Sequence, residues 1–171
     1  MLRATITEYA SRGILIDTNV LLLYLVGLFD ETLIQGFKRT RSQGYTREDF
    51  AVVQRLVSWF ARVITTPQIL AELSNLSFQM EEPRLSQYVS CVVSAVRRFH
   101  EEYVGKDCIL ASPRLHLLPR IGFTDFSIIE AAMKQRYLVL TDDFKAAGYL
   151  RANRCAVINL NQIRGERWLA Q

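Results

Sequence analysis

The sequence predicts an α/β domain in which helices cover a mostly parallel β-sheet. Short apolar runs with the length and composition of buried strands occur at residues 13–16, 63–65, 137–140 and 155–160. Segments in which apolar residues recur at helical spacing separate these runs. Such alternation of strands and helices is typical of a parallel sheet with helices packed on it.

The first half of the chain is expected to contain two strands and four helices. The strand at 13–16 ends at cap-type residues and leads into a helical apolar stretch at 20–29. Residues 30–45 are expected to form a helix and then a loop, and an amphipathic helix follows them. After the strand at 63–65, the Thr-Pro pair at 66–67 favours a new helix, because threonine is a good N-cap and proline suits the first helical position.

The second half continues the alternation. In order, it is expected to hold a helix from Pro83 to about Tyr103, a connector at 106–122, a helix capped by Thr124 or Asp125, a strand, a short helix and a last strand. No internal repeat or linker interrupts the pattern. Residues 1–171 are therefore expected to form a single domain.

The composition is that of a globular protein. The 171 residues are 50% hydrophobic and 22% charged, which excludes a disordered or collagen-like chain. The apolar run at 20–29 is too short to cross a bilayer, which takes about 20 residues, and residues 1–13 lack the apolar core of a secretory signal. Three cysteines without metal-site spacing favour free thiols in a reducing compartment. We therefore expect a cytoplasmic protein with no membrane partner.

The positive charge is concentrated in the last third of the chain. The net charge is +4, and residues 114–171 hold 9 Lys/Arg against 5 Asp/Glu. A cationic segment suits a polyanion such as RNA, because binding releases counterions; an ordinary solvated basic surface is the alternative. The candidate RNA-binding residues are Arg151, Arg154, Arg164 and Arg167.

Acidic residues stand at positions where a surface charge is unusual. Asp17 directly follows one predicted buried strand, and Asp142 and Asp143 follow another. Ligands of open parallel sheets collect at the carboxyl ends of the strands, so these acids are expected to point into one crevice. Asp125 stands at a helix start, and Glu72 borders the apolar stripe of another helix. Each aspartate has an alternative role as a helix N-cap, and Glu72 has one as a solvated helix residue.

Gathered carboxylates suit a hard divalent cation. Close carboxylates raise one another's pKa unless a cation neutralises them, and Mg²⁺ or Mn²⁺ prefers oxygen ligands. Such a metal supports hydrolysis of phosphodiesters without histidine or cysteine. The chain has only 2 histidines, which agrees with this chemistry.

At these residues the sequence resembles the PIN domain family of metal-dependent nucleases. The motifs, in family order, are ILIDTN at 14–19, TPQILAEL at 66–73, GFTDFS at 122–127 and LVLTDDF at 138–144. The resemblance spans residues 14–160. It implies a Rossmann-like three-layer α/β/α sandwich with an Mg²⁺ or Mn²⁺ site that cleaves RNA.

The resemblance also assigns roles to single residues. The catalytic and metal-ligand acids match Asp17, Glu72, Asp125 and, by the Thr-x-Asp spacing, Asp143, with Asp142 as the alternate; Asn19 and Thr141 match polar positions that hold the acids or the metal's water. The 55-residue interval from Asp17 to Glu72 is longer than in short toxin-type members. A helical insertion at roughly 30–62 is expected to reshape the RNA groove.

Three functions follow from these observations. The first is a metal-dependent endoribonuclease, with the toxin of a toxin–antitoxin pair as one form of it; an antitoxin partner and a homodimer are expectations from the resemblance. The second is a non-catalytic PIN-like scaffold that binds RNA or protein. The third is a phosphatase of the haloacid-dehalogenase type, which ranks last because Asn19 stands where its general acid is required.

Overall fold

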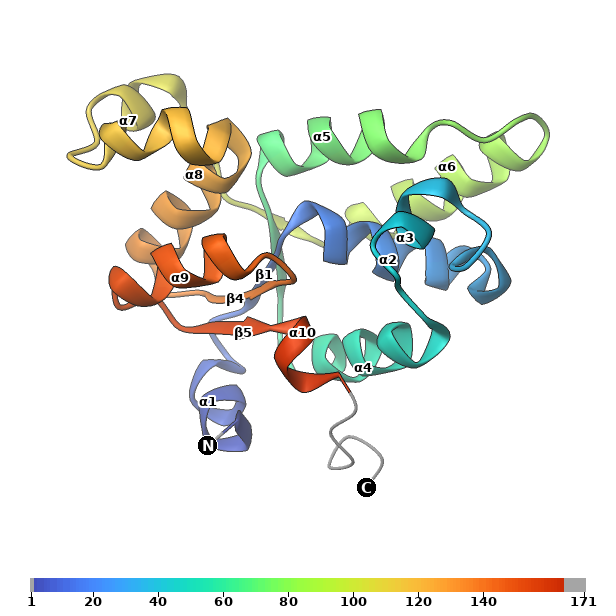
Figure 1. Ribbon diagram of the computed structural model, residues 1–171, viewed down its shortest axis with the longest axis horizontal. Helices are drawn as coiled ribbons and strands as arrows, with labels where there is room; N and C mark the ends of the chain where they lie inside the picture. Colours follow the sequence, from blue (N-terminus) through green and yellow to red (C-terminus); the bar gives the residue numbers. More distant parts are fainter. Residues whose placement is uncertain (1, 165–171) are drawn as a thin grey trace.

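The protein, described here by a computed structural model over residues 2–164, is built on a five-stranded parallel sheet (Figure 1). The strand order is β3-β2-β1-β4-β5, and every neighbouring pair is parallel. The elements are α1 (Leu2–Tyr9), β1 (Ile14–Ile16), α2 (Thr18–Phe29), η1 (Glu31–Leu33), α3 (Lys38–Ser42), α4 (Arg47–Ser58), β2 (Val63–Thr65), α5 (Pro67–Ser77), α6 (Arg84–Val96), β3 (His100–Glu101), α7 (Lys106–Leu110), η2 (Leu115–Leu117), α8 (Leu118–Gln135), β4 (Leu138–Thr141), α9 (Phe144–Ala152), β5 (Val157–Asn159) and α10 (Leu160–Ile163).

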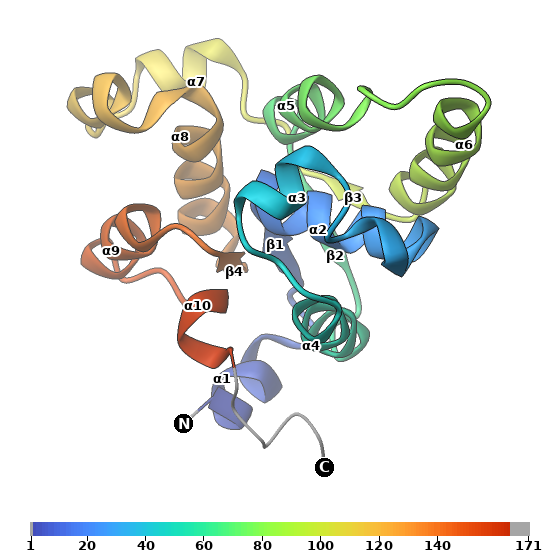
Figure 2. The same cartoon turned by 45° about the vertical axis from the view of Figure 1, so that its right-hand side comes forward.

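Helices flank the sheet, as in a three-layer Rossmann-like sandwich. Figure 2 shows α8 and α9 on one side of the strands and α2, α4 and α6 on the other. The predicted α/β class is confirmed. The physical cause is that each parallel crossover needs a connection long enough to return along the sheet, and a helix provides it.

The central strands and the helix after them form the core. All three residues of β1 are fully buried, and so are the first three of β4. α2 is apolar almost all round because it packs against α4, α5 and α6 as well as the sheet. At Gly27 of α2 the backbone approaches the Phe50 ring so closely that an added Cβ would lie 2.2 Å from it.

The helix expected to reach Tyr103 ends earlier, at Val96. The residues after α6 pair with the edge of β2, and the carbonyl of Thr65 accepts a hydrogen bond from the Glu102 N–H at 2.9 Å. This pairing turns the chain into β3, whose two exposed residues carry no alternating pattern. Pairing with β2 thus determines the conformation of residues 100–102, although their sequence favours a helix.

Two further segments differ from the expected elements. Residues 106–122 hold α7, η2 and the first turn of α8, where a connector was expected. Gly122 interrupts α8 with φ 75° and ψ 175°, so a fresh helical segment starts near the expected cap at Thr124 or Asp125. Residues 30–45 contain the short helices η1 and α3 in place of one longer helix. α1 and α10 add to the expected set.

In the part of the chain that the structure describes, none of the helices has the length and apolar content that spanning a bilayer requires. Cys91, Cys108 and Cys155 are all free thiols.

Candidate functional site

The carboxyl ends of β1 and β4 lie side by side. Ile16 is opposite Leu140 in the parallel ladder, and the Asp17 N–H donates a hydrogen bond to the Leu140 carbonyl at 3.0 Å. Asp17 follows β1, and Asp142 follows β4. The residues after these two strands therefore share one edge of the sheet, which is the edge where α/β sheets bind ligands.

Asp17 is a buried carboxylate at the start of α2. Its Oδ1 accepts a hydrogen bond from the Val20 N–H at 3.1 Å, so it caps the helix, and its residue exposure is 7%. Burial is the main cause that raises the pKa of Asp17 to about 7, and the negative charges of Asp142 and Asp125 raise it further. Hydrogen bonds from the Thr141 hydroxyl and the Val20 N–H act in the opposite direction.

Asp125 and Glu72 approach the same edge from two helices. Burial raises the pKa of Asp125 to about 6, and the charges of Asp143, Glu72 and Asp142 contribute in that order. Glu72, half-buried on α5, accepts a hydrogen bond on Oε2 from the Thr18 hydroxyl at 2.8 Å. Because Thr18 directly follows Asp17, this bond ties α5 to the start of α2.

Asp142 and Asp143 have different surroundings. Asp143 is exposed and caps α9, with Oδ1 accepting hydrogen bonds from backbone N–H groups that include Ala146 at 3.1 Å. Asp142 is partly buried, and its Oδ2 accepts a hydrogen bond from the Tyr45 hydroxyl at 2.6 Å. Its Oδ1 is buried and has no hydrogen-bond partner. The family spacing selects Asp143, whereas Asp142 carries the unpaired buried oxygen and the stronger influence on Asp17.

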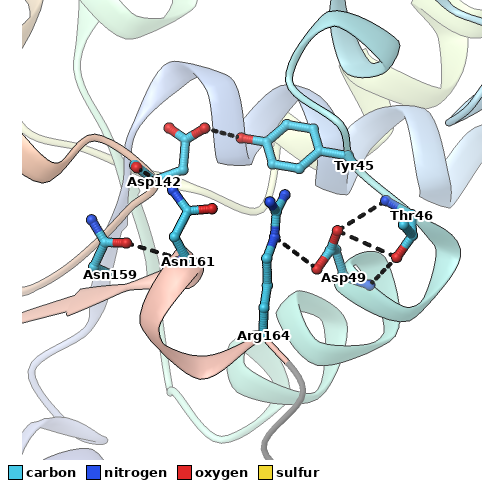
Figure 3. A network of polar contacts seen from close by, with 7 residues as sticks. All are labelled: Tyr45, Thr46, Asp49, Asp142, Asn159, Asn161 and Arg164. Atoms are coloured by element: carbon cyan, nitrogen blue, oxygen red, sulfur yellow. Dashed lines mark hydrogen bonds and ion pairs between the residues drawn. The ribbon is translucent and has the colours of Figure 1, made fainter.

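Tyr45 belongs to a network that joins the α3–α4 connection to Arg164, the residue after α10 (Figure 3). The tyrosine is 2% exposed, and burial together with the charge of Asp142 raises its pKa. The Arg164 guanidinium lies over its ring, 5.2 Å from the centroid, and donates from Nε to Asp49 Oδ1 at 3.0 Å. Asp49 also forms the capping box of α4 with Thr46. Sequence reasoning missed Tyr45, since only the path of the loop brings it to Asp142.

Of the expected RNA-binding arginines, Arg164 alone among those the structure describes is tied to the acidic edge, through Tyr45, whose hydroxyl donates to Asp142. Arg164 is engaged with Asp49 and Tyr45 as described, and Arg151 donates to the Gln162 side chain at 2.7 Å. Arg154 lines a pocket elsewhere in the fold. Arg167 lies outside the residues that the structure describes.

A different arginine stands beside the acids. Arg39 of α3 donates from Nη2 to Asn19 Oδ1 at 3.1 Å, and Asn19 lies in the first turn of the helix that Asp17 caps. The Nε of Arg39 is buried and has no hydrogen-bond partner. In the sequence, Arg39 was one of several cations in a mixed segment, with no signal of its proximity to Asp17.

The donor chemistry fits a hard cation, although no closed cage is formed. Among residues 2–164, no three histidine, cysteine, aspartate or glutamate side chains are close enough to form a metal-binding group. The acids nevertheless influence one another's pKa, and the unpaired Oδ1 of Asp142 is the kind of oxygen that Mg²⁺ or Mn²⁺ binds. Asp17, Asp125, Glu72 and the neighbouring Asp142 and Asp143 are the residues that could hold such an ion.

In comparisons with known proteins, no protein-family model and no curated protein matches this chain.

Proposed function

We propose that this protein is a metal-dependent endoribonuclease that hydrolyses RNA phosphodiester bonds with Mg²⁺ or Mn²⁺. The observation that carries the proposal is the buried Oδ1 of Asp142, which lacks a hydrogen-bond partner although its charge acts on both Asp17 and Asp125. A buried carboxylate oxygen without a partner is costly, and several neighbouring carboxylates add repulsion. A divalent cation relieves both effects. RNA as the substrate rests on the likeness to PIN domains.

The side chains at this edge have two proposed roles, binding the cation and positioning the residues that bind it. Asp17, Asp142, Asp125 and Glu72 would hold the cation, which supplies the charge neutralisation and water activation that phosphodiester hydrolysis requires. The Tyr45 hydroxyl fixes one oxygen of Asp142 and leaves the other available. The Thr141 hydroxyl, which accepts the Asp143 N–H at 3.0 Å, hydrogen bonds to Asp17 and holds it in place.

Arg39 is proposed to bind the substrate phosphate. Its Nη2 donates to Asn19 in the first turn of α2, and its Nε is buried without a hydrogen-bond partner. An arginine fork matches a phosphate better than a lysine does, because it offers two parallel N–H donors. Arg39 lies within the long interval between Asp17 and Glu72, so the insertion would supply the contact that the C-terminal arginines were expected to make.

The test is cleavage of a labelled mixed RNA pool by the purified protein in Mn²⁺, in Mg²⁺ and in EDTA. Wild-type protein is expected to cut only with metal, and Asp125→Asn is expected to lower the rate at least about a hundredfold, the size of loss seen when one electrostatic contact to a transition state is removed. The control is Asp107→Asn, which removes an acid with an 86% exposed side chain. Metal-dependent cutting that survives unchanged in Asp125→Asn would refute the assignment.

Three further measurements refine the roles. If Asp142 is the main ligand, Asp142→Asn should reduce cleavage more than Asp143→Asn does. Arg39→Gln should raise KM and leave Mn²⁺ affinity unchanged, while Arg41→Gln, on the exposed face of the same helix, should change neither. Failure of the wild-type protein both to bind Mn²⁺ and to cut RNA would favour the non-catalytic scaffold.

A further inference from the structure

The edge of the sheet opposite the acids is lined by arginines. Arg62, Arg12, Arg136 and Arg154 precede β2, β1, β4 and β5, each within three residues of the strand. These four strands are neighbours in the parallel sheet, so the arginines in front of them lie along its amino edge. The Arg62 side chain donates from Nη2 to the backbone carbonyl of Arg12 at 3.0 Å, so Arg62 and Arg12 are in direct contact at this edge.

Three of these arginines line one pocket. It has a volume of about 400 Å³ and lies between the ends of α1, α8 and α9. Arg12, Arg136 and Arg154 contribute positive charge to its wall, and Glu8 contributes the single negative charge. The Arg12 guanidinium lies over the Tyr9 ring, 5.2 Å from the centroid, which limits its motion. The wall is therefore cationic and partly ordered.

Two of the arginines occupy backbone positions that favour glycine. Arg136 ends α8 with φ 57°, and Arg154 follows α9 with φ 59°. Among the described residues, they are the two non-glycine residues with positive φ. Left-handed backbone is unfavourable for a side chain with a Cβ. Within residues 2–164, neither guanidinium has a hydrogen-bond or ion-pair partner that would offset this conformation.

We infer that this pocket binds a phosphate group, either as inorganic phosphate or as the phosphate of a small phosphomonoester. Guanidinium groups bind phosphate through paired, charge-assisted N–H donors, and three arginines line this pocket. Three arginines and one glutamate give the lining a net charge of +2, which a phosphate group would balance. The pocket volume exceeds that of inorganic phosphate, so there is room for an attached group. The site is at the other end of the sheet from the acids and does not depend on the proposed nuclease.

The left-handed positions allow a test in which loss of binding is separated from loss of folding. In the double variant Arg136→Gly and Arg154→Gly, two charges disappear while the backbone gains a residue that suits positive φ. Its unfolding temperature without ligand should equal or exceed that of the wild-type protein. The control is the double variant Arg120→Gln and Lys145→Gln, which removes the same charge from exposed positions outside the pocket.

Binding is measured by isothermal titration calorimetry at fixed ionic strength in EDTA, with inorganic phosphate, AMP and adenosine as probes. The wild-type and control proteins should bind phosphate and AMP but not adenosine, and the double glycine variant should bind at least about tenfold more weakly. Tighter binding of AMP would identify a phosphomonoester site, and binding of phosphate at least as tight would identify a free-phosphate site. No binding by the wild-type protein, unchanged binding in the glycine variant, or an equal loss in the control would overturn the inference.

Discussion

Replacing Asp17 by asparagine is expected to stabilise the metal-free protein at alkaline pH. Asp17 is 7% exposed, and burial is the main reason that its pKa rises to about 7 from an ordinary value of 3.8. Asparagine is as good an N-cap as aspartate, so its side-chain oxygen can still accept the Val20 N–H. The substitution therefore removes the buried charge and keeps the cap.

The two pKa values set the magnitude and the pH range of the effect. The difference between the two pKa values corresponds to a loss of at most about 4 kcal/mol in the free energy of unfolding, at about 1.4 kcal/mol for each pKa unit. Between about pH 4 and pH 7 the folded state holds a proton that the unfolded chain has released, so the free energy of unfolding falls as the pH rises. The wild-type protein should thus be most stable below pH 4 with respect to this group, and Asp17→Asn should not show this loss.

Urea unfolding, followed by circular dichroism in EDTA at pH 5 and pH 8, measures the difference in free energy of unfolding between the wild-type protein and Asp17→Asn. The variant should be more stable than the wild-type protein at pH 8, by up to about 4 kcal/mol, and the gap should narrow at pH 5. Millimolar Mg²⁺ should then raise the stability of the wild-type protein more than that of the variant, because the ion binds the charged acid. If the two proteins are equally stable at pH 8, or if the variant is less stable, then burial and the neighbouring acids do not destabilise the charged form of Asp17.

Three further substitutions test other contacts. Gly27→Ala should destabilise the fold by about 3 kcal/mol in urea unfolding, since the new Cβ would lie 2.2 Å from an aromatic ring of α4; a neutral result would mean that the helices separate easily. Arg164→Met should cost about 3–5 kcal/mol, because it leaves the buried Asp49 carboxylate without its cationic partner, and adding Asp49→Asn should recover part of that loss. Tyr45→Phe should cost about 1–3 kcal/mol by leaving Asp142 Oδ2 without its donor; thermal unfolding that matches the wild-type protein would contradict this.

The sheet could be predicted from the sequence because its central strands are buried on both faces. Such strands are continuous apolar runs, and the residue after each run lies at a known edge. The positions of Asp17 and Asp142 at the carboxyl edge of the sheet were predicted in this way. β3 was missed because its two residues are exposed and owe their conformation to pairing with β2. No local pattern marks a strand of that kind.

The surroundings of the acids were harder to predict than the acids. Tyr45 lies 97 residues before Asp142 in the chain, and Arg164 lies 115 residues after Asp49. Contacts at such separation depend on how the α3–α4 segment and α10 pack, which hydrophobic periodicity does not encode. The same limit explains why charge counting directed attention to the last third of the chain and overlooked Arg39.

Capping of helices explains only part of the acidic edge. Asp17 and Asp143 cap α2 and α9, whereas Asp125, Asp142 and Glu72 cap no helix. Even for Asp17 the cap is worth about 1 kcal/mol, whereas its raised pKa implies a cost of up to about 4 kcal/mol for the charged form. A cap at an exposed helix start would provide the same stabilisation without that cost. Helix capping therefore does not account for the burial of this carboxylate among other acids, and the proposed cation would. The response of the Asp17→Asn variant to Mg²⁺ tests that proposal.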